Sequence, residues 1–388
     1  MTKAPPLPLD GIRVVDFTQV MLGPCCTQVL GDYGADVIKI ERPRSGDLSR
    51  WSIGSDPDGL NNPVFASLNR NKRSLALDMR RDDDKEVVRR LVAGADVVVN
   101  NFRPGVMERM DLSYEDCRAL NPRIVYAVGT GYGLEGPYVK KGGQDVLAQA
   151  MTGVMARKAD PSHPLATYPT ALADYSAGMH LVQAILLALL QREKTGEGQL
   201  VAVSLYSSMI AMQMQEAAMW MMRRADLNWA AMPLSGVFET SDGAIVMVGA
   251  FKENPLRDIC SALGIPDLSK EQRFATLDEQ KKHRVELQEL FRRRFAGDTT
   301  AHWVAALEGV DILCAPVRSL AEALDDPQTE VNGLLMDAGT TDAGSVRVIG
   351  SPLTMSAAPV TVRHAPPRLG AHNVDILAEL GVRQEAAE

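Results

Sequence analysis

With 388 residues, of which 46% are hydrophobic, the chain is long enough to bury a large core and to form more than one domain. Its net charge of −8, without a block of like charges, argues against a nucleic-acid partner held through phosphate contacts. No apolar run approaches the roughly 18 residues that a membrane span needs, and the helix after Asp174 is expected to be too short. We therefore expect neither a nucleic-acid nor a membrane partner.

The cysteines and the first residues of the chain favour a reducing compartment. The proline-rich stretch 1–10 contains no apolar signal core. The cysteines are five, an odd number, and no two have CxxC spacing: Cys25, Cys26, Cys117, Cys260 and Cys314. This pattern predicts a cytoplasmic protein without disulfides and without a structural metal.

The first half of the chain alternates predicted strands with predicted helices. An apolar strand at 12–17 leads into a helix whose first turn suits Pro24 and which ends before Gly34. The alternation continues to Leu205, with strands expected at 37–41, 74–77, 96–100 and 124–128 and helices at 84–93 and 113–120. Repeated βαβ units favour a parallel sheet. The most economical fold is therefore α/β, a Rossmann-like doubly wound parallel sheet.

One carboxylate, Asp174, lies where a loop ends and a strongly apolar helix begins. Helix N-termini stabilise charged carboxylates, so the ionised form of Asp174 is favoured there. The helix is expected to stop near residues 194–198, where Gly196 and Gly198 suit a C-terminal cap. From position alone, Asp174 is either a simple N-cap or a functional carboxylate, and the residues around it do not decide between the two.

The pattern changes after Leu205. A methionine-rich stretch at 209–222 predicts a buried core helix or a subunit-interface helix, since thioethers fill irregular gaps. Strands at 236–240 and 244–248, joined by a Ser-Asp-Gly turn, form a predicted hairpin. Helices are then expected at 255–263, 277–295 and 301–307, and the proline-rich tail is expected to return to the first domain. These elements predict a large domain at 1–205 and 326–388, a linker helix at 206–229 and a smaller α+β domain at 230–325.

Several chemistries have no sequence signature in this chain. GxGxxG, GxxxxGK[ST] and GxSxG are all absent, and the six histidines show no paired spacing. Basic residues near predicted strand ends remain: Arg42, Lys72, Arg73 and Arg109. Ligands of open α/β sheets bind outside the carboxyl ends of the strands, where such cations suit the phosphates of a nucleotide-like ligand.

Blocks spread over nearly the whole chain resemble the family III CoA-transferases, typified by formyl-CoA transferase and carnitine CoA-transferase. The resemblance starts with the Leu-Asp-Gly-Ile-Arg-Val-Val-Asp-Phe run at 9–17, Gly-Pro at 23–24 and the stretch 30–41. It continues, in the family's order, at 69–74, 101–105, 120–123, 131–133, 173–178, 195–199, 240–243 and 367–372.

The resemblance implies that Asp174 is the catalytic nucleophile. In such enzymes a carboxylate attacks an acyl-CoA thioester and forms a mixed anhydride, and the released CoA thiolate then forms an aspartyl-CoA thioester. The substrates are an acyl-CoA and a small carboxylic acid, and no metal or redox cofactor is needed. The resemblance also implies an interlocked homodimer.

The resemblance places CoA along the first domain. Asp145 matches an acidic position close to the acyl group, and the alternative is that it caps the following helix. The residues that match CoA-contacting or neighbouring positions are Gln19, Val20, Met21, Leu22, Arg42, Lys72, Arg73, Arg80, Asn101, Phe102, Arg103, Arg109 and Met110.

Two departures from related enzymes bear on the reaction. The alpha-methylacyl-CoA racemases share the fold and have a His-Asp pair where this chain has Gln144-Asp145, and an amide cannot replace an imidazole as a base. Transferase activity is therefore favoured over racemase or epimerase activity, and a CoA-binding protein without catalysis is a third alternative. The stretch 229–236 also lacks the glycine run of formyl-CoA transferase, so the acceptor acid stays open.

Overall fold

The computed structural model describes residues 6–53, 62–160, 162–341 and 344–382. These residues divide into two compact units, one drawn from 1–154, 167–213 and 327–388 and the other from 155–166 and 214–326. The segment predicted as a linker helix is shared between the units, because α7 (Leu205–Met212) falls in the first and α8 (Met214–Arg223) in the second.

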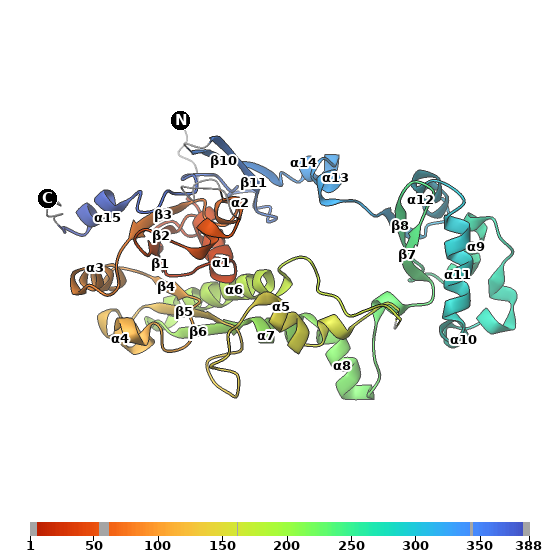
Figure 1. The fold of residues 1–388 in the computed structure, drawn as a ribbon, viewed down its shortest axis with the longest axis horizontal. Coiled ribbons are helices and arrows are strands. Elements are labelled where there is room, and N and C mark those ends of the chain that lie inside the picture. The colour runs from red at the N-terminus through yellow and green to blue at the C-terminus, as the bar shows by residue number, and fades with distance from the viewer. Residues whose placement is uncertain (1–5, 54–61, 161, 342–343, 383–388) are drawn as a thin grey trace. The chain divides into compact units, whose positions relative to one another are not determined.

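A six-stranded parallel sheet forms the centre of the first unit (Figure 1), as the alternating pattern predicts. Its spatial order is β3-β2-β1-β4-β5-β6, so the order reverses between β1 and β4. Open α/β sheets bind ligands at such a reversal, outside the carboxyl ends of the strands. The strands are β1 Arg13–Asp16, β2 Asp36–Glu41, β3 Lys72–Ala76, β4 Val97–Asn100, β5 Val125–Thr130 and β6 Leu200–Ser204.

Both faces of this sheet are buried, since neighbouring residues of β1 contribute to two different cores. Val14 packs on the face covered by α1, α5, α6 and α7, whereas Val15 packs on the face covered by α3, α4 and α15. Strands buried on both sides are expected to be continuously apolar, and β4 begins Val-Val-Val. The further helices of this unit are α1 Leu22–Asp32, α2 Pro63–Ala66, α3 Asp82–Ala93, α4 Tyr114–Leu120, α5 Asp145–Met151, α6 Leu172–Thr195, α14 Pro327–Val331 and α15 Asn373–Glu379.

Helix α6 extends from Leu172 to Thr195, close to the bounds that the sequence pattern indicates. It has 24 residues, and its C-cap Gly196 has the left-handed backbone (φ 78°) of the expected glycine cap. By length and composition α6 is a candidate membrane span, since an 18-residue window within it has a mean hydropathy of 1.3. The expectation that this helix is too short to span a membrane is therefore wrong. Its buried residues pack in the core with α1 and the sheet.

The C-terminal segment returns to the first unit, as predicted. Asn71 holds it in place, because its side-chain oxygen accepts hydrogen bonds from the backbone N–H groups of Arg363 and His364. Strand β11 (Gly344–Ile349) pairs in antiparallel fashion with β10 (Leu335–Thr341), and neither strand is among the elements predicted from the sequence.

The second unit packs helices on a three-stranded antiparallel sheet of order β7-β8-β9. The predicted hairpin is present as β7 (Ser235–Glu239) and β8 (Ala244–Val248), and β9 (Leu313–Pro316) pairs with β8. The core contains Phe238 stacked on Phe295 with ring centroids 4.8 Å apart. The helices are α9 Pro255–Leu263, α10 Leu277–Lys282, α11 Arg284–Phe295, α12 Thr300–Glu308 and α13 Leu320–Leu324, so the single helix expected at 277–295 is interrupted at His283.

The methionine-rich stretch at 209–222 is divided between the end of α7 and α8. Met209 in α7 is buried in the core of the first unit, as predicted. Helix α8 has no buried residue, and its Met221 and Met222 side chains are 68% and 78% exposed. The prediction of a buried core helix is therefore wrong for α8, and the alternative of a subunit interface stays a prediction.

Candidate active site

Two cavities lie at the carboxyl edge of the six-stranded sheet. The first, of about 440 Å³, is lined by the loops that follow β1, β4 and β5 and by Asp174 in the first turn of α6. The second, of about 1030 Å³, is lined by the loops that follow β1, β2, β3 and β4. Gln19 and Phe102 line both, so the two cavities adjoin. Their position at the reversal of strand order is the one expected for a ligand.

Asp174 is the acidic residue in the lining of the first cavity. It is the third residue of α6, and Ala171 occupies the N-cap position, so the interpretation of Asp174 as an N-cap is wrong. Burial and, to a smaller extent, the charge of Asp145 raise the pKa of Asp174 to about 6, against the lowering effect of a backbone hydrogen bond from Leu22. The carboxylate is therefore ionised at neutral pH but less solvated, and more basic, than an ordinary aspartate.

A close approach of α6 to α1 brings the Leu22 N–H to Asp174. Gly178 faces α1, and a Cβ at this position would lie 2.8 Å from the backbone oxygen of Leu22. The glycine therefore permits a helix contact that any larger residue would push apart. This close contact explains why a glycine follows Asp174 by one helical turn in the Asp-Tyr-Ser-Ala-Gly motif.

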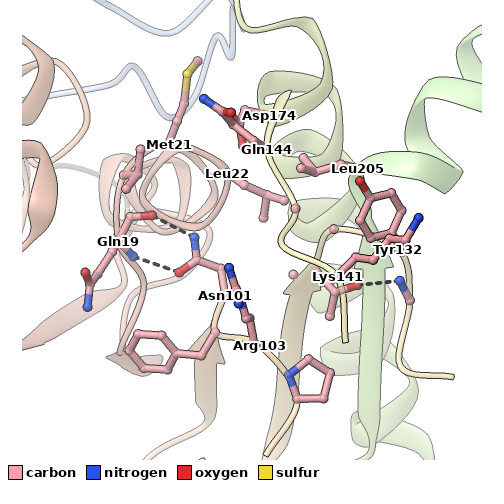
Figure 2. A pocket seen from close by; sticks show the side chains of 18 of the residues that line it. Gln19, Met21, Leu22, Asn101, Arg103, Tyr132, Lys141, Gln144, Asp174 and Leu205 are labelled. Atoms are coloured by element: carbon pink, nitrogen blue, oxygen red, sulfur yellow. Dashed lines mark hydrogen bonds between the residues drawn. The ribbon is translucent and has the colours of Figure 1, made fainter. Parts of the chain in front are cut away.

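The loop between β1 and α1 lines the same cavity as Asp174 and is held at two points, of which Figure 2 shows the contact between Gln19 and Asn101. The Asn101 side chain accepts a hydrogen bond from the Gln19 N–H (2.9 Å) and donates one to the Gln19 carbonyl (2.7 Å). The Val20 N–H donates to Asp47 at 3.0 Å. Val20 has a φ of 66°, which is rare and strained for a β-branched residue, so these partners stabilise an otherwise unfavourable backbone.

A buried ion pair lies under this loop. Lys39 Nζ is 2.8 Å from Asp47 Oδ2 and donates to the Thr18 carbonyl at 2.7 Å. Burial alone would raise the pKa of Asp47, but the Lys39 ammonium and hydrogen bonds to Asp47, including the one from Ser49, lower it overall. Asp47 is therefore a permanent acceptor for the Val20 N–H, and it belongs to the supporting structure of the site.

The second cavity is rich in cations. Three acidic side chains line it (Glu41, Asp78, Asp84), against six basic ones: Arg42, Arg44, Arg80, Arg81, Lys85 and Arg109. Within the described residues, no ion pair or side-chain hydrogen bond engages Arg42 or Arg109. Guanidinium groups left without an anionic partner suit a ligand with phosphate groups.

Most residues predicted to bind CoA line one of the two cavities. Gln19, Val20, Met21, Leu22, Asn101, Phe102 and Arg103 line the first. The second includes Gln19 and Phe102 again and adds Arg42, Arg80, Arg109 and Met110. The structure thus brings these predicted residues together along one edge of the sheet.

Lys72 and Arg73 lie outside both cavities. They are the first two residues of β3, whereas the cavities lie at the carboxyl edge. Lys72 is completely buried, 3.3 Å from Asp16, and Arg73 is paired with Asp36 (2.7 Å) and Glu379 (2.6 Å). Their distance from the cavities follows from the register of β3. The Lys72 ammonium and the Arg73 guanidinium both form ion pairs within the protein.

Asp145 also lies outside the cavity lining, although its neighbour Gln144 belongs to it. Asp145 is the first residue of α5, but its carboxylate does not cap that helix. It accepts hydrogen bonds from the backbone of Ala173 and Asp174 in α6. The expectation that Asp145 caps the following helix is therefore corrected, because the helix that it caps is α6.

Several lining residues were not predicted. In the first cavity these are mainly Leu48, Tyr132, Lys141, Gln144 and Leu205, and in the second they include Arg44, Arg81 and Lys85. Tyr132 had a signal, since the Gly-Tyr-Gly stretch at 131–133 begins three residues after the end of the strand predicted at 124–128. Arg44 and Arg81 lie within two residues of the predicted binding residues Arg42 and Arg80. A prediction that included the two residues on either side of each predicted one would have found them.

Comparisons with known proteins agree with this geometry. Residues 9–373 match the sequence model of CoA-transferase family III. The chain is 35% identical over 382 residues to a succinyl-CoA:glutarate CoA-transferase of Mus musculus, covering 96% of this chain and 86% of that protein. It is 32% identical over 403 residues to a formyl-CoA:oxalate CoA-transferase of Escherichia coli O157:H7, covering 96% of each chain.

A solved structure has the same fold. The crystal structure of a CaiB/BaiF family protein from Brucella suis superposes with a TM-score of 0.86 at 32% identity, covering 97% of this chain and 100% of that one. The relatives named here are transferases, so they give the racemase alternative no support. This chain belongs to the family III CoA-transferases.

Proposed function

We propose that this protein transfers CoA between an acyl-CoA thioester and a free carboxylic acid through covalent intermediates on Asp174. The observation that carries the proposal is the place of Asp174, half-buried in a cavity that adjoins a second, cation-rich cavity. A reactive carboxylate at one end and unpaired guanidinium groups at the other match the two ends of an acyl-CoA molecule.

The reaction proceeds by four exchanges at carbonyl carbons, and none requires a net proton transfer. An Asp174 oxygen attacks the thioester carbonyl, the carbon–sulfur bond breaks, and CoA thiolate leaves a mixed anhydride. The thiolate attacks the Asp174 carbonyl of the anhydride, which releases the first acid and forms an aspartyl-CoA thioester. The incoming carboxylate then repeats the two steps in reverse order, and Asp174 is regenerated as a carboxylate.

The surrounding residues have separate tasks in this scheme. Partial burial of Asp174 limits its hydration, and the pKa near 6 makes it a better nucleophile than an ordinary carboxylate while leaving it ionised at neutral pH. The fixed backbone of the Gln19–Leu22 loop lines the same cavity as Asp174, and the thioester would lie against it. Arg42 and Arg109 would hold phosphate groups of CoA.

The relatives suggest which acids to test first. The mouse protein is named for succinyl-CoA and glutarate, and the Escherichia coli protein for formyl-CoA and oxalate. We therefore propose short dicarboxylic acids as the first acceptors, with succinyl-, acetyl- and formyl-CoA as donors. An exchange screen read by mass spectrometry identifies the pair that this protein uses.

We also propose that the protein is an interlocked homodimer. The exposed apolar side chains of α8, among them Trp220, Met221 and Met222, support a contact with a second copy. Light scattering after gel filtration measures the mass directly. A monomer at micromolar concentration would contradict this part of the proposal.

The covalent mechanism is tested by trapping. After incubation with an acyl-CoA donor, hydroxylamine should convert Asp174 to a hydroxamate that peptide mass spectrometry locates, and Asp174→Asn should lose both the adduct and exchange activity by at least about a thousandfold. The matched control is Asp116→Asn, which changes an exposed aspartate of α4 and should leave both unchanged. Normal exchange by folded Asp174→Asn would overturn the proposal.

A further inference from the structure

Asp145 provides the N-terminal cap of the helix that carries Asp174, although it belongs to a different helix. Its Oδ1 accepts hydrogen bonds from the backbone N–H of Ala173 at 2.6 Å and of Asp174 at 3.0 Å. These N–H groups are in the first turn of α6 and have no partner within that helix. Ala171, at the N-cap position, offers no side-chain oxygen. The cap is therefore supplied from α5, across 28 residues of chain.

The second oxygen of Asp145 is also occupied. Its Oδ2 accepts a hydrogen bond from Gln149 Nε2 at 2.6 Å, and Gln149 is completely buried. The Gln149 carbonyl oxygen in turn accepts from the backbone N–H of Tyr168 at 3.0 Å, in the segment that leads into α6. Asp145 itself is 7% exposed. Both carboxylate oxygens of Asp145 therefore accept hydrogen bonds from N–H groups.

This environment leaves Asp145 no way to react with a substrate. Both oxygens are used by N–H groups, and the side chain lies outside the lining of both cavities. Gln144, the preceding residue, reaches the first cavity instead. Asp145 therefore acts through the residues that it contacts, and one of them is Asp174.

We propose that Asp145 is a positioning residue of the transfer reaction: its carboxylate fixes the first turn of α6 and places a second negative charge beside Asp174. The proposal rests on the proposed function of Asp174 as nucleophile. It differs from both roles considered from the sequence, since Asp145 lies outside the lining of both cavities and does not cap α5.

The two effects of Asp145 act on the same reacting carboxylate. Holding the backbone N–H of Asp174 determines the direction in which its side chain leaves the helix, and a small misplacement of a nucleophile costs a large factor in rate. The fixed negative charge opposes ionisation of Asp174 and so makes that carboxylate more basic. The other groups that face Asp174 are the Leu22 N–H and the Cys25 thiol, both from α1. Burial holds the pKa of Cys25 at about 11, so the thiol is neutral when Asp174 titrates.

The test is the pH profile of Asp145→Asn, which keeps the shape of the side chain and removes its charge. In the wild type we expect kcat/KM to rise with pH through an apparent pKa near 6, because Asp174 must be ionised to attack. In Asp145→Asn the rise should move to lower pH by about half a unit or more, and kcat should fall by about tenfold. The KM for the acyl-CoA should stay within about twofold, since Asp145 does not line the cavities.

Two further variants separate charge from position. Gln149→Met removes the donor to Asp145 Oδ2 but keeps the charge, so kcat should fall about threefold or more with an unchanged pH profile. Asp116→Asn changes an aspartate in the capping box of α4 and should alter neither kcat nor the profile. If Asp145→Asn fails to fold, Gln149→Met still decides the matter, because an unchanged kcat in that variant overturns the positioning role.

The hydroxylamine adduct keeps this inference distinct from the proposed function. An adduct on wild-type Asp174, together with a folded Asp145→Asn whose pH profile and kcat equal those of the wild type, would overturn the role of Asp145 alone. Absence of the adduct from an active wild-type enzyme would overturn the covalent mechanism itself.

Discussion

Two groups of cations in the first unit differ in what they contact. Lys39, Arg50, Arg70 and Lys72 are buried, and each lies within 3.3 Å of a buried carboxylate. Arg42 and Arg109 instead lie exposed in the lining of the second cavity, and within the described residues no side-chain ion pair holds them. Removing a charge from water costs several kcal/mol unless a partner compensates, so every buried cation here needs its anion.

The comparison separates structural cations from candidate ligand-binding ones without reference to any relative. The charge of a buried, paired cation is compensated by a carboxylate within the protein, whereas an unpaired cation beside a cavity can bind an anionic ligand. Lys72 and Arg42 therefore have opposite expected phenotypes, although both were predicted to bind CoA. The predictions below test this contrast.

The largest effect on stability is expected from Lys72→Met. This variant leaves the Asp16 carboxylate buried without its ammonium partner, and breaking a buried pair in this way costs about 3–5 kcal/mol. Urea denaturation followed by circular dichroism measures the free energy of unfolding. Arg109→Met is the matched control and should change it by less than about 0.5 kcal/mol. Wild-type stability combined with lost CoA binding in Lys72→Met would reverse the assignment.

Arg109→Ala and Arg42→Ala should weaken the binding of free CoA by about tenfold each, because each removes one charge-assisted contact to a phosphate. Titration calorimetry measures the Kd, and the free energy of unfolding should not change. Arg118→Ala, which removes an exposed arginine of α4 outside both cavities, should bind CoA as the wild type does. Unchanged CoA affinity in both cavity variants would remove the electrostatic basis of the proposed site.

The sequence predicts those parts of this site that depend on local pattern. The alternating strands and helices predict the parallel sheet, and the arginines after strand ends, Arg42 and Arg109, are predicted to meet at one edge. This succeeds because all parallel strands end on the same side.

The remaining features depend on contacts between residues far apart in the chain. Asp174 resembles an N-cap locally, and only the fold reveals that the cap comes from Asp145. Lys72 looks like a ligand-binding lysine until the register of β3 places its ammonium group beside Asp16. Whether α8 is buried also cannot be inferred from its composition, since apolar helices serve both cores and interfaces.

Asp174 is the anionic counterpart of the unpaired arginines, a partly buried carboxylate that forms no ion pair with any cation among the described residues. Its pKa is near 6 in the folded protein and about 4 in the unfolded chain, so the unfolded state loses its proton first as the pH rises. The charged carboxylate therefore costs stability above about pH 6 and costs nothing below about pH 4. Asp174→Asn should be more stable than the wild type by about 1 kcal/mol at pH 8 and equal to it at pH 4.

The melting temperatures of Asp174→Asn and the wild type at pH 8 and pH 4 test the sign of this difference in stability. Asp116→Asn is again the control, because its capping carboxylate is exposed and should give no gain at high pH. A loss of stability in Asp174→Asn at pH 8 would mean that the native state favours the charged form, contrary to the environment described here.

The smallest effect is expected from Arg80→Ala, even though Arg80 lines the second cavity. Its guanidinium already donates two hydrogen bonds to Asp78, at 2.8 and 2.7 Å, so it is less available to a phosphate than Arg42. CoA affinity should fall by less than about threefold, as for other exposed, already paired charges. Asp78→Asn should release the guanidinium and tighten CoA binding, and in that background Arg80→Ala should then cost as much affinity as Arg42→Ala. The double-mutant cycle therefore tests whether an arginine binds CoA because it lacks an anionic partner in the protein or because of its position in the cavity. If Arg80→Ala lowers CoA affinity by the same factor in the wild type as in the Asp78→Asn variant, position in the cavity alone determines which arginines bind CoA.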